Sequence, residues 1–284
     1  MGYDGSLKFN TEINDSGFNS GISKLGSVAS GGLKVIAGSV AGVAAAFGAV
    51  SKMSLDSVAS LEQNIGGVET LFKDSAQTVI DNANNAYKTA GVSANKYMET
   101  VTSFSASLLQ GLGNNTAEAA RIADMAMVDM SDNANKFGSN MTDIQNAYQG
   151  FAKQNYTMLD NLKLGYGGTQ AEMIRLINDS GILNEKIENL DNVSFDQIIQ
   201  AIHKIQENMG IAGTTSAEAL TTIEGSVQSA KAAFDNFLNG SSSPQELADA
   251  VKAAAENITN NLMQIVPRLA KELPEVGNLL MDSL

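Results

Sequence analysis

The sequence predicts a mainly all-α protein: a multi-helix body with a short N-terminal strand, an apolar Gly/Ala-rich helix and C-terminal amphipathic helices. Three observations lead to this prediction. The chain has only 3 prolines and 6% aromatic residues, whereas strand-rich domains favour β-branched and aromatic side chains. Apolar residues recur at intervals of three and four, as on one face of an α-helix. Several Ser and Thr residues are followed three residues later by Glu or Gln, a pattern typical of helix starts.

Residues 1–32 form the first predicted region. Leu7, Phe9, Thr11 and Ile13 alternate with polar residues, and this period of two predicts one short strand. A Gly/Ser-rich stretch follows the strand.

Residues 33–52 are predicted to form the apolar helix. The segment Val35–Val50 carries no charge, and Gly38 and Gly42 have the spacing that lets two helices approach closely. Because a membrane-spanning helix needs about 20 apolar residues, this segment is at the lower limit. Three interpretations stay open: a buried or self-associating helix, a segment that enters a membrane only at some stage, and a permanent anchor.

The helical body is expected over residues 53–240. Several helix starts, there and just beyond, are predicted from capping boxes, in which a Ser or Thr caps the helix and a Glu or Gln bonds back to it. The pairs are Thr169 with Glu172, Ser194 with Gln197, Thr215 with Glu218, and Ser243 with Glu246; Asn115 with Glu118 is a weaker version.

Four apolar stripes support the helices, and the first is expected to break near Ser131 and Gly138. The third alternates steps of three and four strictly, as in a helix-pairing seam. The third and the fourth are expected to be buried against neighbouring helices or other copies. The stripes are Ile122–Ala126–Met130–Ala134–Phe137–Met141–Ile144–Tyr148–Phe151, Phe195–Ile198–Ile202–Ile205–Met209, Leu220–Ile223–Val227–Ala230–Phe234–Phe237, and Leu247–Val251–Ala254–Ile258–Leu262–Ile265–Leu269–Leu273.

The segment Asn239–Pro244 is the clearest predicted linker, because it is rich in Gly and Ser and ends in Pro. Residues 241–284 are therefore assigned as the linker and the start of a further helical region. Pro267 is expected to kink the fourth stripe and Pro274 to interrupt it.

Composition excludes several classes of site. The net charge of −13 argues against specific nucleic-acid binding, which needs a basic surface. The chain has no cysteine, which excludes disulfides, a thiolate nucleophile and cysteine-based zinc sites. With His203 as the single histidine, no multi-histidine metal site can form.

No catalytic, cofactor-binding or metal site is expected. His203 and Glu207, one turn apart, are interpreted as a helix-surface pair rather than a proton relay. The carboxylates of Asp124, Asp129 and Asp132 are interpreted as a solvated helix face. The glycines of Gly165–Thr169 lack the strand and lysine of a phosphate-binding loop, so they predict a tight turn with Thr169 as helix cap.

Two blocks, Ser131–Ile177 and Phe195–Gly240, resemble the N-terminal conserved domain of tail tape measure proteins from long-tailed bacteriophages and prophages. The resemblance is most specific in the phrase Tyr156–Gly165, in the glycine turn after it, and in a second group near Gly213. The matching residues are Asp160, Asn161, Leu162, Gly165, Gly167, Gly168, Thr169, Gly213, Thr214, Glu218, Gly225 and Ser226.

The resemblance implies a non-enzymatic virion protein that scaffolds assembly of the tail tube and sets tail length. It implies tail-tube subunits, tail assembly chaperones and tail-tip proteins as partners, and self-association through helices. It places the protein in the host cytoplasm during assembly and in the lumen of the tail afterwards. The resemblance also implies ejection at infection, with a transient contact to the host membrane that Val35–Val50 would make.

Two other functions stay open at this point: a membrane-active, pore-forming protein that uses Val35–Val50, and a peptidoglycan hydrolase. The length of the chain also departs from the family. At about 1.5 Å per residue, a single helix of this chain would span at most roughly 430 Å. Family members contain a longer ruler, so this sequence is expected to be a fragment.

Overall fold

The computed structural model describes residues 43–219, 221–261 and 263, with side chains from Asp56 onward. The chain divides into two compact units, Met1–Ala49 and Val50–Leu284, and the following description concerns the second. The described residues are mainly helical and contain no strand, so the mainly α class is confirmed. The predicted strand, Gly38 and Gly42 lie outside the described residues, whereas Val43–Val50 of the predicted apolar helix are helical.

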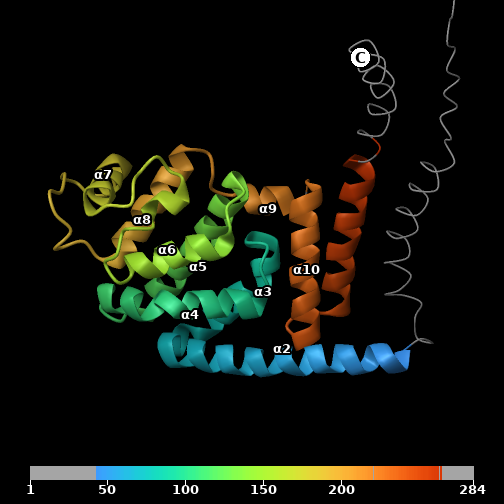
Figure 1. Cartoon of the computed structure of the whole chain (residues 1–284). Helices are drawn as coiled ribbons and strands as arrows, with labels where there is room; N and C mark the ends of the chain where they lie inside the picture. Colours follow the sequence, from blue (N-terminus) through green and yellow to red (C-terminus); the bar gives the residue numbers. More distant parts are fainter. Residues whose placement is uncertain (1–42, 220, 262, 264–284) are drawn as a thin grey trace, which may run out of the picture. The chain divides into compact units, whose positions relative to one another are not determined.

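Most elements follow one another through turns or short loops, and a longer loop over residues 181–194 joins α7 to α8 (Figure 1). They are α2 (Val43–Phe72), η1 (Lys73–Ser75), α3 (Ala76–Thr89), α4 (Ala94–Gly111), α5 (Thr116–Phe137), α6 (Met141–Phe151), η2 (Leu159–Leu162), α7 (Gln170–Ser180), α8 (Phe195–Asn208), α9 (Thr214–Ala219) and α10 (Ile223–Asn239). A further helix covers residues 244–261.

Most predicted helix starts are confirmed. Ser194 and Gln197 form a capping box at α8, and the Ser194 amide donates to Gln197 Oε1 at 3.0 Å. Ser243 and Glu246 form a second one at residue 244. Asn115 caps α5 by accepting from the Glu118 amide at 3.2 Å. These starts are predictable because all the bonding atoms lie within four residues of chain.

Two boundaries differ from the prediction. Gly138 ends α5 in the left-handed conformation as expected, but Ser131 does not break the helix. Its hydroxyl is buried and donates to the carbonyl of Ala90, so tertiary contact gives this serine its partner. Thr215 is not a helix cap either, because α9 begins at Thr214. The Thr215 amide donates to the carboxylate of Asp132 on α5.

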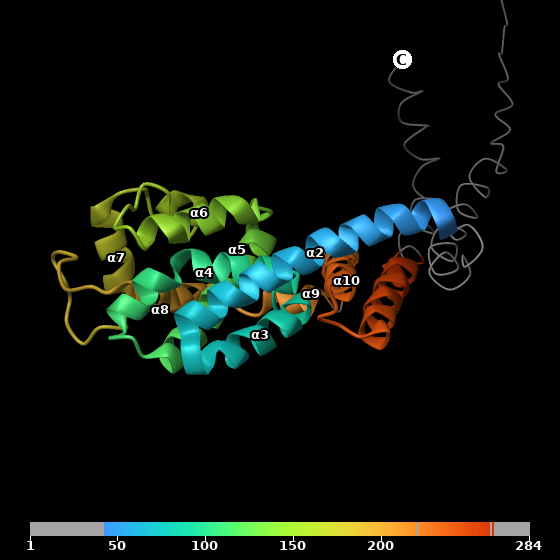
Figure 2. The same cartoon turned by 90° about the horizontal axis from the view of Figure 1, so that it is seen from below.

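Helix α5 lies at the centre of the described body. It contacts α3, α4, α6, α8 and α9, and Figures 1 and 2 show these helices around it. Its apolar face is fully buried at Ile122, Ala126 and Met130. Next to it, Phe104 of α4 meets Phe195 of α8 edge to face with ring centroids 5.9 Å apart. The core therefore assembles around one helix, while α7 and α10 pack on the helices that surround it.

The helix over residues 244–261 packs back beside α10, as both views show. Leu247 is buried in a small cluster with Tyr87 of α3 and with Ala232 and Ala233 of α10. The segment between the two helices is a tight turn in which the Ser241 amide donates to Asn236 O at 2.8 Å. The helices on either side of this turn therefore pack as neighbours.

The third apolar stripe is oriented differently from the prediction of burial against neighbouring helices. Ile223, Phe234 and Phe237 are 37%, 37% and 39% exposed. The buried face of α10 instead carries mostly small and polar residues, with Leu238 near its end as the one large apolar side chain: Gly225, Ser226, Ser229, Ala232, Ala233, Asn236, Leu238 and Asn239. Small residues let α10 approach α3 and α9 closely, and this close packing leaves the larger side chains on the outside.

Candidate functional site

The first motif segment is an ordered loop between η2 and α7. Gly168 packs against the backbone of Thr157: a Cβ added at Gly168 would lie 2.3 Å from the Thr157 carbonyl oxygen. Thr169 caps α7 by accepting from the Glu172 amide at 3.2 Å, as predicted. The glycine therefore serves close backbone packing, which is a structural role.

Side chains of α7 fix the glycine turn. Arg175 Nη2 donates to the Gly165 carbonyl at 2.7 Å, and its guanidinium lies 4.3 Å from the centre of the Tyr166 ring. The Gly167 amide donates to Glu172 Oε2 at 3.1 Å. Gly165 has a φ of 86°, a conformation that glycine adopts without strain. The turn is thus held by α7 itself.

The remaining residues of the first motif differ in burial. Leu162 is fully buried, and its carbonyl accepts from Asn133 Nδ2 of α5 at 2.8 Å. Asn161 Nδ2 reaches the Asp143 carbonyl of α6 at 3.5 Å, and Asp160 is exposed. Leu162 therefore anchors this segment to the central helix.

The second motif segment begins where α9 meets α5. The carboxylate of Asp132 accepts from the Gly213 amide at 2.6 Å and from the Thr215 amide at 2.7 Å. Thr214 is the first residue of α9, and its hydroxyl donates to the Ile211 carbonyl at 2.8 Å. An acidic side chain suits this position because the first turn of a helix has unpaired amides and a partial positive charge.

The second segment ends in close packing of α9 on α10. A Cβ added at Gly225 would lie 2.6 Å from the backbone carbonyl of Glu218, so only glycine fits. Ser226 is buried, and its hydroxyl donates to the Thr222 carbonyl at 2.6 Å. These residues, like those of the first segment, form backbone contacts.

The C-terminal half of α5 carries four buried polar residues, Asp129, Ser131, Asp132 and Asn133, which we call the α5 hub. Asp132 binds the second motif segment and Asn133 binds the first. The first motif segment, at Leu162, and the second, at Gly213 and Thr215, therefore meet on one helix. Asp129 and Asp132 contradict the prediction of a solvated face, and Asp124 is half-buried with its Oδ1 accepting from Tyr97 OH at 2.7 Å.

His203 is more than the predicted surface pair. Its Nδ1 lies 2.8 Å from Oδ1 of Asp129, whose side chain is only 2% exposed, while its Nε2 lies 3.4 Å from Glu207 Oε1. Burial raises the pKa of Asp129 to about 6, although the hydrogen bond from His203 opposes this shift. The same hydrogen bond raises the pKa of His203. The pair joins α5 to α8 and was not predictable from spacing, because 74 residues separate its members.

We expect stability to fall as the pH rises from 5 to 8. Both pKa values are raised by folding, so each group stabilises the fold at low pH and loses this contribution as the pH rises through its folded pKa. For Asp129, with a pKa of about 6 against 3.8, the loss over this window is about 1 kcal/mol. Urea unfolding at several pH values measures it.

The variant Asp129→Asn serves as the control for this pH dependence. It should flatten the slope, because the amide does not titrate. Glu118, Glu172, Glu207 and Glu246 have lowered pKa values through hydrogen bonds, and they titrate below this window. An unchanged slope in Asp129→Asn would show that the pair does not cause it.

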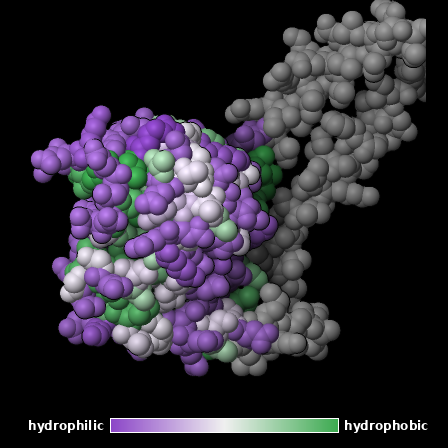
Figure 3. Space-filling view, turned by 60° about the vertical axis from the view of Figure 1, so that its left-hand side comes forward, coloured by the Kyte–Doolittle hydropathy of each residue, from purple (hydrophilic) through white to green (hydrophobic). Residues whose placement is uncertain are grey.

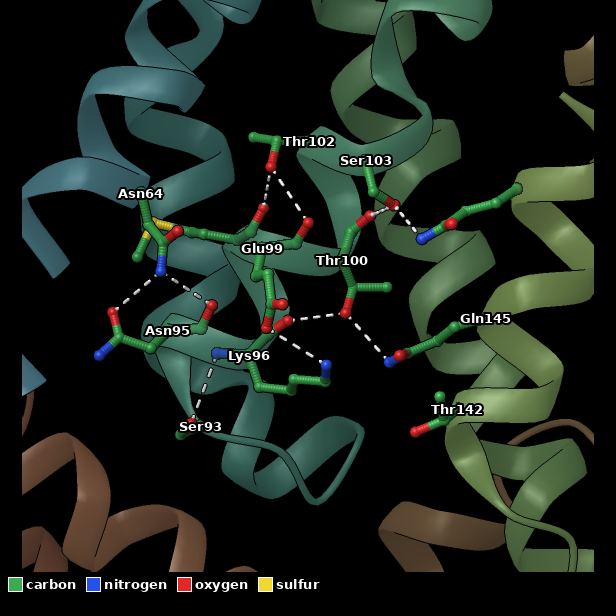
Figure 4. A network of polar contacts seen from close by, with 12 residues as sticks. Asn64, Ser93, Asn95, Lys96, Glu99, Thr100, Thr102, Ser103, Thr142 and Gln145 are labelled. Atoms are coloured by element: carbon green, nitrogen blue, oxygen red, sulfur yellow. Dashed lines mark hydrogen bonds and ion pairs between the residues drawn. The ribbon is translucent and has the colours of Figure 1, made fainter. Parts of the chain in front are cut away.

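A polar network joins α2, α4 and α6 (Figure 4). Asn64 Nδ2 donates to Asn95 Oδ1 at 3.2 Å, and Gln145 Nε2 donates to Thr100 Oγ1 at 3.0 Å. A groove of about 650 Å³ opens beside this network, lined by residues such as Asp56, Asn64 and Asn95. The amides along the groove are bonded to one another, so the network links the helices.

Among the residues described, no three His, Cys, Asp or Glu side chains are grouped so that they could share a metal ion. No helix within the described ranges combines the length and apolar character needed to cross a membrane. Figure 3 shows one face on which hydrophilic residues predominate and hydrophobic residues form separate patches.

Comparison with known proteins finds no family model, no curated protein and no solved structure that matches this chain.

Proposed function

We propose that the protein is a non-enzymatic structural component of a bacteriophage tail, which scaffolds tail-tube assembly and sets tail length. The observation that supports the proposal best is the α5 hub. Asp132 and Asn133 bind the two segments that carry the tape measure resemblance, so both belong to one packed unit. The matching residues are used for turns, caps and backbone packing, as expected for a scaffold.

The proposed partners follow from this role. Tail-tube subunits, tail assembly chaperones and tail-tip proteins would bind the outer helix faces, in the host cytoplasm during assembly and in the tail lumen of the virion. Ejection at infection would bring Val35–Val50 to the host membrane transiently. The net charge of −13 favours release alongside DNA, because like charges repel.

The proposal predicts that tail length follows the length of the chain. An insertion of about 70 helix-forming residues after Asn261 should lengthen the tail by roughly 100 Å, at about 1.5 Å per residue. This position leaves Leu247 and Ala254 packed on the body. Tail length is measured by electron microscopy of phage that carries the altered gene.

A matched control places the same insertion between Glu185 and Lys186, in the exposed loop between α7 and α8. Residues added in this loop would lie beside the helical body and would not lengthen the helix that continues beyond it, so tails should keep their length. Viable particles of unchanged length from the first insertion would contradict the ruler role. If both insertions lengthened the tail equally, tail length would depend on the number of added residues and not on where they are placed.

A further inference from the structure

Helix α10 carries an apolar surface that no other element covers within the described residues. Ile223, Val227, Ala230, Phe234 and Phe237, here called the α10 stripe, are separated by steps of four and three. Its three largest side chains are more than a third exposed, and they are half of the six large hydrophobic residues exposed in the described part of the chain. An apolar seam of this spacing is the kind of surface that a second helix covers.

Charges beside the α10 stripe indicate which helix covers it. Glu224 and Lys231 lie seven residues apart along one flank of the stripe, and both are exposed. Within the described residues, neither takes part in an ion pair. The opposite flank, at Ser226 and Ala233, is buried against the rest of the chain. A covering helix would therefore meet Glu224 and Lys231 on the same side, with the exposed Asp235 one turn beyond Lys231 and farther from the stripe.

We propose that the α10 stripe binds the α10 stripe of a second copy of this chain, with the two helices antiparallel. In antiparallel pairs the same flank of each helix faces that of its partner, so Glu224 of one copy meets Lys231 of the other, twice by symmetry. The seam then places Phe234 against Ile223 of the second copy, and Val227 against Ala230. A parallel pair would leave Lys231 opposite Ser226 or Ala233, with no charge partner.

The pairing is expected to be weak and reversible. Five residues on one helix bury less than the roughly 1,600 Å² of a standard interface. The two ion pairs are exposed, so they select the orientation more than they add affinity. Self-association through helices is already implied by the tape measure resemblance; this inference adds the surface and the orientation, and it is argued from the outer face of α10 rather than from the tail role.

The test uses the full chain and measures the monomer–dimer equilibrium by sedimentation over a concentration series. Lys231→Glu and Glu224→Lys should each weaken the dimer roughly tenfold or more, because each replaces two attractive contacts by two repulsive ones. An equimolar mixture of the two variants should regain the original affinity, since every contact between them is again attractive. The double variant Glu224→Lys/Lys231→Glu should also dimerise alone.

A second comparison tests the apolar seam. Phe234→Asp should abolish the dimer, whereas Met209→Asp, which removes an apolar residue that is 46% exposed at the end of α8, should leave it unchanged. Both side chains are exposed, so the helical circular dichroism should not change. A chain that stays monomeric at every concentration overturns the proposal, as does a dimer that survives Phe234→Asp. Failure of the mixture to restore affinity overturns the antiparallel arrangement.

Discussion

The variant Gly168→Ala should lose about 3 kcal/mol of unfolding free energy, one of the two largest effects expected in this chain. The added Cβ would lie 2.3 Å from the Thr157 carbonyl oxygen and 2.9 Å from its carbon. Both are backbone atoms, so a rotamer change cannot relieve the overlap, and the loop before α7 must move. Urea unfolding followed by circular dichroism measures the loss.

Gly66→Ala is the matched control for Gly168→Ala. Gly66 lies inside α2, and a Cβ there would meet no atom within 4 Å. Because alanine restricts the unfolded chain and favours helix, this variant should gain about 0.5–1 kcal/mol. If both variants lost stability equally, the close contact with Thr157 would not be the reason that glycine is needed at 168.

Features that depend on neighbours in the chain were predictable from the sequence. The caps at Asn115, Thr169, Ser194 and Ser243 follow from side chains that bond to amides two or three residues away. The first stripe and the left-handed Gly138 also follow from local pattern. The mainly α class is the sum of such local signals, which is why it could be inferred.

The α5 hub could not be predicted, because its partners come from distant segments. Asp129 and Asp132 look like a charged surface in the sequence, since carboxylates are almost never buried without a partner. Their partners, His203 and the Gly213 and Thr215 amides, lie 74 to 83 residues away. Only the folded chain brings these groups together.

The α10 stripe shows that the spacing of apolar residues does not predict which face of a helix is buried. Its spacing correctly indicated a helix, but spacing does not say whether the apolar residues of that helix face the core of the chain or its surface. Ser226, Ser229 and Asn236 form the buried face because the Ser229 hydroxyl donates to Tyr87 O and Asn236 Oδ1 accepts from the Ala94 amide. Buried hydrogen bonds thus override the usual rule that the larger apolar face is inside.

The variant Asp132→Ala is the other change expected to have a large effect, with a loss of about 3–5 kcal/mol. It would leave the buried Thr215 amide and the part-buried Gly213 amide at the start of α9 with no acceptor. Asp132→Asn should lose less, because its amide oxygen can accept one of the two bonds. Urea unfolding gives the total, and hydrogen exchange should show faster exchange at these two amides.

The variant Asp160→Ala tests whether a residue contributes to stability because it is buried or because it belongs to the motif. Asp160 belongs to the tape measure resemblance but is exposed, and its loss should change stability by less than about 0.5 kcal/mol. Asp132 bonds the motif without having been recognised as part of it. If Asp132→Ala proves mild and Asp160→Ala severe, the α5 hub does not organise the two segments. If Asp132→Ala instead loses more stability than Asp160→Ala, as expected, the second motif segment is held in place by the carboxylate of Asp132 on α5, which is not one of the matching residues.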